Sequence, residues 1–281
     1  MTEAGVTPQA LILGLRGLGV HEATTVIVHA SLSAFGHIRG GADTLCAMIR
    51  EVGGNRCTIV MPGFTPQLIH PSVRVAAPLT QKKQAELAEE IPVFDKAATP
   101  VGRKIGATAE TFRKLRDTIR SSHPYTSFLA NGPAAVEIAR HQPLAYRLSA
   151  AGPLGALYDR DALIVLLGVS WQQCTALHLA EYTSAYRGRR FGKWPVPQPR
   201  PAGHEWIDVD DLLLWEGDFP AIGRYIAETP AMHMARRLIG NANCTAVKMR
   251  PAVDFASHWL AANRDLSAFG TPSGWKDLQF R

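Results

Sequence analysis

The sequence predicts an α/β fold with a central mixed, mainly parallel sheet and helices on both faces. Three runs of β-branched and aliphatic residues, at 24–30, 57–61 and 162–169, have the length and character of buried strands. Helix-spaced segments follow the first and third runs, and this alternation favours parallel strands covered on both faces. With 281 residues, 46% of them hydrophobic, the chain is long enough to bury one large core.

The remaining elements follow from periodicity and from helix start and stop signals. We expect helices at 8–18, 40–52, 81–90, 111–119, 132–140, 174–186, 221–228, 230–239 and 253–262. We expect a late strand at 244–249, mostly loop over 63–110, a proline-rich connection at 194–200 and an acidic segment at 205–218. No repeat or low-complexity tract divides the chain, so we predict a single domain over 1–281, with a small lobe around 190–245.

Composition argues against several classes of protein. No stretch approaches the roughly 18 to 20 apolar residues of a membrane helix, and an N-terminus with Glu3 and Arg16 does not resemble a signal peptide. The four cysteines form no CxxC pair, which argues against zinc and disulfides and for a reducing cytoplasm. The basic residues behind the net charge of +6 are dispersed, without a nucleic-acid-binding motif. We therefore expect a cytoplasmic protein without metal, membrane or nucleic acid, whose charge would suit an anionic ligand such as coenzyme A.

Residues 166–182 carry the strongest chemical signal. A buried strand ends here and a helix begins shortly after, and ligands in open α/β sheets sit beyond the carboxyl ends of the strands. Thr175, His178 and Glu181 follow at i, i+3 spacing, on one face of that helix. An imidazole can take a proton from an attacking amine near neutral pH, and a carboxylate can fix its tautomer or hold a substrate cation. The same spacing fits a buried structural histidine with a solvated Glu181, and a Cys174–His178 nucleophile pair is a weaker hypothesis.

Two further segments have the character of ligand loops. Residues 26–41 run from a strand through small and hydroxyl residues into a helix, where close approach to the backbone and free amides favour phosphate. Residues 120–133 form a polar, proline-punctuated loop that carries Ser121, His123 and Ser127. Each segment also has an ordinary interpretation, as a strand–turn–helix connection and as a structural crossover.

Seven segments in order resemble the aminoglycoside 3-N-acetyltransferase (antibiotic N-acetyltransferase) family. They are VHASLSAFG (28–36), TIVMPGFT (58–65), ETFR (110–113), RSSHPYTSFLANGP (120–133), GPLGALYDRDALIVLLGV (152–169), CTALHLAEY (174–182) and MRPAVDFASHWL (249–260). One such motif is weak, whereas seven in the family's order are specific. The resemblance implies an α/β fold distinct from GNAT acetyltransferases. It also implies acetyl-CoA as donor and the 3-amino group of a 2-deoxystreptamine aminoglycoside as acceptor.

The resemblance also implies roles for individual residues. His178 corresponds to the family's general base, Glu181 to its partner acid near the acceptor amine, and Thr175 to a residue of the acetyl site. The coenzyme A loop would contain Ser31, Leu32, Ser33 and Gly36, and the pantetheine and phosphate channel Phe112, Arg113, Ser121 and Ser127. Gln172 stands where the family often has an aspartate. We take Gln172, Glu181 and Asp208 as candidate acceptor-binding residues.

The mechanism that the resemblance implies is direct transfer. His178 would remove a proton from the amine, the amine would attack the thioester, and the Thr175 hydroxyl or free backbone amides would hold the oxyanion. The protein would act as a monomer or homodimer. Gln172 and the basic charge favour a different amine, because a polycation is best steered by an acidic cleft. Two further hypotheses are a hydrolase that uses Ser170 or Cys174 with His178, and a non-catalytic coenzyme A-binding protein.

Overall fold

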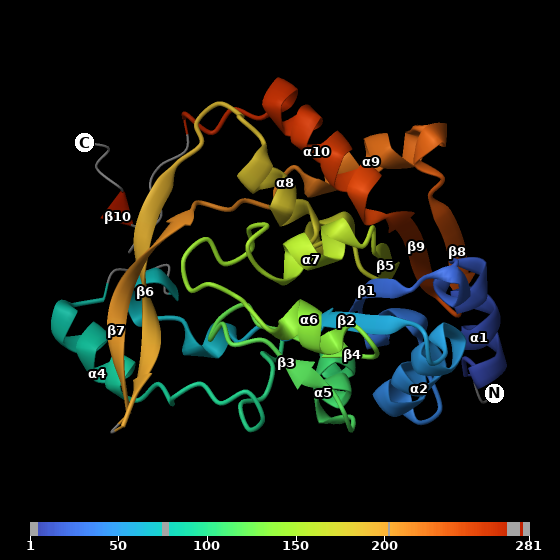
Figure 1. The fold of residues 1–281 in the computed structure, drawn as a ribbon, viewed down its shortest axis with the longest axis horizontal. Helices are drawn as coiled ribbons and strands as arrows, with labels where there is room; N and C mark the ends of the chain where they lie inside the picture. Colours follow the sequence, from blue (N-terminus) through green and yellow to red (C-terminus); the bar gives the residue numbers. More distant parts are fainter. Residues whose placement is uncertain (1–4, 75–78, 202, 269–275, 278–281) are drawn as a thin grey trace.

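The computed structural model describes residues 5–74, 79–201, 203–268 and 276–277 (Figure 1). These residues form a seven-stranded sheet of order β3-β4-β2-β1-β5-β9-β8. Its strands are β1 (Thr25–Ala30), β2 (Thr58–Pro62), β3 (Ile119–Arg120), β4 (Phe128–Asn131), β5 (Leu163–Leu167), β8 (Ala235–Ile239) and β9 (Ala242–Lys248). β1 pairs in parallel with both β2 and β5, and the outer pairs are antiparallel. The α/β class and the mixed sheet are confirmed, with parallel pairing confined to the three central strands.

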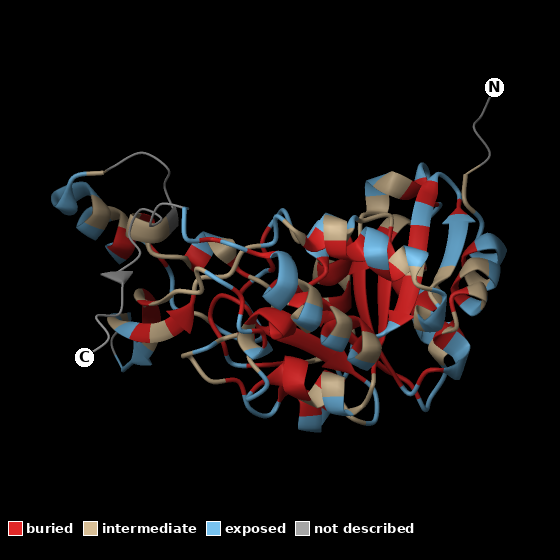
Figure 2. Ribbon diagram, turned by 90° about the horizontal axis from the view of Figure 1, so that it is seen from above, coloured by how far each residue is buried: buried red, intermediate tan, exposed pale blue. Residues whose placement is uncertain are grey.

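Helices cover both faces of this sheet, as predicted. The helices of the described residues are α1 (Pro8–Gly17), α2 (Gly41–Gly53), α3 (Pro71–Arg74), α4 (Gln81–Glu89), α5 (Ala107–Lys114), α6 (Ala135–Ala139), α7 (Pro153–Asp159), α8 (Leu177–Thr183), α9 (Phe219–Glu228) and α10 (Met249–Asn263). α1, α2 and α5 pack on one face, and α6, α7, α8 and α10 on the other. Alternation along β1 explains this, because Ile27 joins one core cluster while Val26 and Val28 join the other. The central strands are almost wholly buried (Figure 2).

A long antiparallel hairpin lies apart from the main sheet, beside α4 (Figure 1). It consists of β6 (Phe191–Arg200) and β7 (Gly203–Leu212), with β10 (Lys276–Asp277) paired to the other edge of β6. The prediction of a mere connection at 194–200 is therefore wrong. Pro195, Pro197 and Pro199 are tolerated in a strand because they alternate, so their missing N–H groups lie on one edge. That edge faces away from β7, since the Pro195 carbonyl accepts a hydrogen bond from the Tyr125 hydroxyl at 2.6 Å.

Other differences from the sequence predictions share one cause, which is pairing with distant partners. The helix predicted at 230–239 is wrong, because a short 3-10 turn (Pro230–Met232) leads into β8, which pairs with β9. β3 and β4 lie where a loop and helix ends were expected, and β4 pairs with β2. The helix predicted at 111–119 instead spans Ala107–Lys114, and the one predicted at 174–186 begins only at Leu177.

The region around 190–245 divides between the hairpin, α9 and the main-sheet strands β8 and β9. The prediction of a single domain with a small lobe stays a prediction. Across the described ranges, no helix combines the length and the apolar character needed to cross a bilayer.

Candidate active site

A cavity of about 1190 Å³ opens at the carboxyl ends of β1, β2 and β5. Its walls come from the segments that follow these strands, at 28–41, 61–64 and 168–173, together with the loop at 104–109. His178 of α8 and Glu216 complete the lining. This is the edge at which open α/β sheets bind their ligands, and the volume suits a large ligand.

The predicted pair of His178 and Glu181 comes together on α8. The Nδ1 atom of His178 lies 2.5 Å from Oε2 of Glu181, one helical turn further on. The Nδ1–H group of His178 donates a hydrogen bond to this fully buried carboxylate, so the free lone pair of the ring is on Nε2. Nε2 makes no hydrogen bond with any part of the chain that the structure describes, and the ring edge packs on Phe219. A histidine held in this tautomer beside a cavity can act as a general base.

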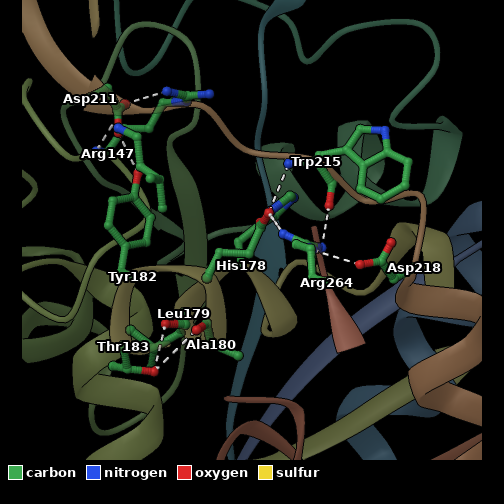
Figure 3. Close-up of polar contacts among 12 residues, drawn as sticks. Arg147, His178, Leu179, Ala180, Tyr182, Thr183, Asp211, Trp215, Asp218 and Arg264 are labelled. Atoms are coloured by element: carbon green, nitrogen blue, oxygen red, sulfur yellow. Dashed lines mark hydrogen bonds and ion pairs between the residues drawn. The ribbon is translucent and has the colours of Figure 1, made fainter. Parts of the chain in front are cut away.

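Arg264 explains how the Glu181 carboxylate can be buried. Its Nη1 donates to Oε1 of Glu181 at 2.5 Å, and the Trp215 backbone N–H donates to the same oxygen at 2.8 Å. Arg264 is 1% exposed and also donates to Asp218 at 2.6 Å and to the Trp215 carbonyl at 2.7 Å (Figure 3). A buried carboxylate is tolerated when it is paired and fully hydrogen-bonded. Because both oxygens are engaged and Glu181 does not line the cavity, it is placed to orient His178 rather than to contact an acceptor.

A second polar cluster fixes α8 from the side of the hairpin. The Tyr182 hydroxyl donates to the buried carboxylate of Asp211 on β7, which also pairs with Arg147 (Figure 3). Burial, followed by the charge of Asp211, raises the pKa of Tyr182 well above its usual value. The helix that carries His178 is therefore tied to the hairpin as well as to Arg264.

Thr175 lies in the turn before α8 and lines the cavity, but its hydroxyl is not bonded to the His178 ring. Its partner is His29 of β1, whose Nε2 lies 3.0 Å from the Thr175 hydroxyl and accepts the Thr175 backbone N–H at 3.1 Å. His29 is 7% exposed, and burial, with the nearby charge of His178, lowers its pKa to about 3. The sequence interpretation did not single out His29 as a site residue.

The predicted coenzyme A loop lines the cavity at every predicted position. These residues are Ser31, Leu32, Ser33 and Gly36. The loop turns back at Gly36 with φ of 81°, a left-handed conformation that favours glycine. Gly41 at the start of α2, the first three residues of α5 and Lys104 also line the cavity. The Gly41 N–H donates to the Ile38 carbonyl at 2.9 Å, so the groups suited to a phosphate are the amides at the start of α5 and the cation of Lys104.

The four residues predicted for the pantetheine and phosphate channel lie outside the cavity lining. Phe112 is 1% exposed in the core. Arg113 pairs with Glu110 at 2.7 Å and donates to the Ala97 carbonyl, and its hydrogen bond lowers the pKa of Glu110 to about 2. A guanidinium engaged in this way stabilises the start of α5, and a direct contact with a phosphate stays a prediction.

Ser121 and Ser127 are fully buried and hold the crossover loop together. Ser121 donates to the Gln142 side chain at 2.6 Å. Ser127 donates to the Gly63 carbonyl at 2.8 Å and accepts from Arg120 at 2.9 Å. Their hydroxyls are satisfied within the protein, which fits a structural crossover.

The three candidate acceptor-binding residues have different placements. Gln172 lines the cavity, whereas Glu181 is buried behind His178 and Asp208 lies exposed on β7, away from the lining. Among the described residues, the carboxylate that does line the cavity is Glu216, which belongs to the acidic segment at 205–218. Among the described residues, no group of three His, Cys, Asp or Glu side chains is arranged to hold a metal ion.

The hydrolase hypothesis lacks a suitable nucleophile. Cys174 is fully buried, does not line the cavity, and burial raises its pKa to about 12. Ser170 lines the cavity, but its hydroxyl donates to Gln173 at 2.7 Å and caps a 3-10 turn. Neither side chain bonds to His178, as nucleophilic catalysis with a histidine base requires.

The site residues that the sequence interpretation missed had weak local signals. His29 stood out only as a polar residue in an apolar strand, within the motif VHASLSAFG. Arg264 follows Glu181 by 83 residues, beyond the last matched motif. Lys104 and Glu216 lie in loops rich in other charged residues, so nothing in the sequence distinguished them.

The fold and the site together define an α/β protein with a histidine–carboxylate pair beside a large cavity. The model of the aminoglycoside 3-N-acetyltransferase family matches residues 27–261, and the chain belongs to this family of acyltransferases.

Individual relatives agree over nearly the whole chain. The Bacillus subtilis prophage-derived aminoglycoside N(3')-acetyltransferase-like protein YokD is 31% identical over 257 residues, covering 92% of this chain and 93% of that protein. Its crystal structure superposes with a TM-score of 0.87 over 93% of this chain and 96% of that one. Aminoglycoside N(3)-acetyltransferase IX of Micromonospora chalcea is 27% identical, covering 92% and 94%. AAC-IIIb, solved as a binary complex with CoASH, is 26% identical with a TM-score of 0.78, covering 96% and 100%.

Proposed function

We propose that this protein transfers an acetyl group from acetyl-CoA to the 3-amino group of a 2-deoxystreptamine aminoglycoside. The observation that carries the proposal is the contact between His178 and Glu181 at the wall of a cavity that the 31–36 loop also lines. Family membership and the relatives named aminoglycoside N(3)-acetyltransferases support the choice of acceptor.

The shape and charge of the cavity support acetyl-CoA as the donor. AAC-IIIb was solved as a complex with CoASH, and the cavity of this protein is large and has small residues along the loop after β1. The start of α5 and Lys104, which line this cavity, would face the anionic phosphates. The acetyl group would then lie near Thr175 and His178.

In the proposed reaction, His178 acts as the base. Its Nε2 takes a proton from the acceptor amine, and the amine nitrogen forms a bond to the acetyl carbonyl carbon. The bond from that carbon to sulfur breaks, and the leaving thiolate takes the proton back from the imidazolium. Glu181 stabilises the imidazolium while it exists, and Arg264 holds Glu181 in place.

The charge of the cavity favours a second candidate acceptor, an amine that is not a polycation. Among the described residues that line the cavity, Glu216 supplies the one carboxylate, Lys104 opposes it, and Gln172 is neutral. An acceptor with several ammonium groups is best bound where several carboxylates face it. A biosynthetic or metabolic amine with a single cationic group would suit this lining.

The test is release of free thiol from acetyl-CoA with gentamicin, kanamycin, neomycin, apramycin and a set of simple monoamines as separate acceptors. We expect release with an aminoglycoside and a loss of about 100- to 10,000-fold in His178→Ala. His258→Ala, at an exposed histidine on α10, is the matched control and should retain turnover. Release with monoamines alone would move the acceptor to the second candidate. Acetyl-CoA binding without any release would leave a non-catalytic binder.

We also propose that the protein works in the cytoplasm. All four cysteines are free and buried, which suits a reducing compartment.

A further inference from the structure

We propose that His29 is a positioning residue that makes the Thr175 hydroxyl a hydrogen-bond acceptor toward the substrate amine, leaving the thioester oxyanion to backbone N–H groups. This inference rests on the proposed function, which supplies the amine and the thioester. His29 lies at the end of β1 and Thr175 before α8, 146 residues later. Both line the cavity next to His178.

The tautomer of His29 follows from its contacts. The Thr175 backbone N–H donates to Nε2 at 3.1 Å, and a ring nitrogen that accepts a hydrogen bond carries no proton. The single ring proton is therefore on Nδ1. Burial lowers the pKa of His29 to about 3, so a doubly protonated ring does not compete at neutral pH.

The direction of the hydroxyl bond follows from this tautomer. The Thr175 oxygen lies 3.0 Å from the same Nε2, and two lone pairs at that distance would repel each other. The hydroxyl then donates its one proton to His29, where it shares the single Nε2 lone pair with the backbone N–H, and it presents only lone pairs to the cavity. Such an oxygen can accept a hydrogen bond from an amine but cannot donate one to an oxyanion. The role that the sequence analysis expected for Thr175 is thereby reversed.

Packing alone does not account for an imidazole at this position. Nδ1 of His29 is buried and has no hydrogen-bond partner within the described part of the chain. A buried N–H without an acceptor destabilises the folded state, and an aliphatic side chain would avoid that penalty. The ring nitrogen that has partners is Nε2, and both partners, a hydroxyl and a backbone N–H, belong to Thr175. The contact with Thr175 is therefore what the imidazole supplies.

Two pairs of variants separate this role from a structural one. In His29→Gln the side-chain oxygen reaches the position of Nε2 and can accept from Thr175. In His29→Asn the shorter amide ends near the position of Nδ1 and leaves Thr175 unbonded. Thr175→Ser keeps the hydroxyl, and Thr175→Val removes it at nearly constant volume.

Steady-state kinetics with acetyl-CoA and an active acceptor provide the first readout. We expect kcat/KM for the acceptor to fall about 10-fold in His29→Asn and Thr175→Val, mainly through its KM, with the KM for acetyl-CoA unchanged. His29→Gln and Thr175→Ser should stay within about threefold of the wild type. Equal losses in His29→Gln and His29→Asn would overturn the inference. So would a loss confined to kcat, which is the signature of an oxyanion donor.

Hydrogen exchange of the Thr175 amide is a readout that needs no turnover. We expect slow exchange in the wild type and in His29→Gln, and faster exchange in His29→Asn, with exchange elsewhere in the core unchanged. If no acceptor supports turnover, the proposed function fails while this measurement still decides the role of His29. Equal protection of Thr175 in all three proteins would overturn the inference.

Discussion

The ion pair between Arg264 and Glu181 makes a prediction that separates orientation from chemistry. We consider Arg264→Met, which removes the charge and keeps much of the volume, and Arg264→Lys, which keeps the charge but loses the planar fork. In the first variant, the buried carboxylates of Glu181 and Asp218 both lose their cation.

The size of the effect can be worked out from the geometry. Breaking a buried pair by removing one partner costs about 3 to 5 kcal/mol, so we expect the free energy of unfolding to fall by about that amount in Arg264→Met. Glu181 is bonded at 2.5 Å on each side, to His178 and to Arg264. Without Arg264, the carboxylate loses the charged partner that fixes Oε1, and its hold on the His178 ring becomes weaker.

Loss of this contact should lower activity through the orientation of His178. A general base contributes about 100- to 10,000-fold, so we expect kcat/KM to fall by about 10-fold or more in Arg264→Met. We expect a smaller loss in Arg264→Lys, because the ammonium still presents a cation to Glu181.

The assay is thiol release from acetyl-CoA at a temperature where circular dichroism shows each variant folded. Urea unfolding of the same proteins gives the change in the free energy of unfolding. A kcat/KM in Arg264→Met within about twofold of the wild type would refute the role of Arg264 in holding Glu181, whatever the change in stability. Equal losses in Arg264→Met and Arg264→Lys would show that the planar geometry of the guanidinium, and not its charge, is the cause.

Two further predictions concern groups buried away from solvent. Burial, with the nearby charge of Arg147, lowers the pKa of His123 to about 3, whereas an unfolded histidine titrates near 6.5. The stability that neutral His123 contributes is therefore complete above about pH 6.5 and is lost as the pH falls toward 3. His123→Asn keeps an acceptor for the Tyr125 backbone N–H, which lies 3.0 Å from the His123 ring, so its free energy of unfolding in urea should fall less steeply than that of the wild type between pH 6.5 and 4. Equal slopes in the two proteins would contradict this. Cys174→Ala should retain thiol release within about threefold, because the thiol lies outside the cavity, and a loss of about 100-fold or more would revive the nucleophile hypothesis.

The parts of the fold that the sequence predicts are those with local signals. β1, β2 and β5 are continuous apolar runs because both of their faces are buried, and such runs are visible without knowing their partners. The pair of His178 and Glu181 was predictable for the same reason, since i, i+3 spacing brings them together within α8.

The parts that were missed depend on partners far away in the chain. β8 lies within the segment 230–239, for which a helix was predicted, and becomes a strand through its pairing with β9. His29 and Thr175 are 146 residues apart in the sequence, and no pattern in either segment predicts their contact. The channel assignment of Ser121 and Ser127 came from the resemblance, and only the hydrogen bonds of the folded chain show how those hydroxyls are used.

The row of prolines on β6 has a consequence for how copies of the protein behave together. A two-stranded hairpin has an open edge that another chain could extend, which is a route to strand exchange and aggregation. Here Pro195, Pro197 and Pro199 have no backbone N–H to donate along that edge. The Pro195 carbonyl already accepts a hydrogen bond from the Tyr125 hydroxyl. On this edge, the residues ahead of the first proline, Gly192 and Lys193, already pair with the chain's own β10. The outer edge of β6 is therefore a poor template for a strand from another copy of the protein.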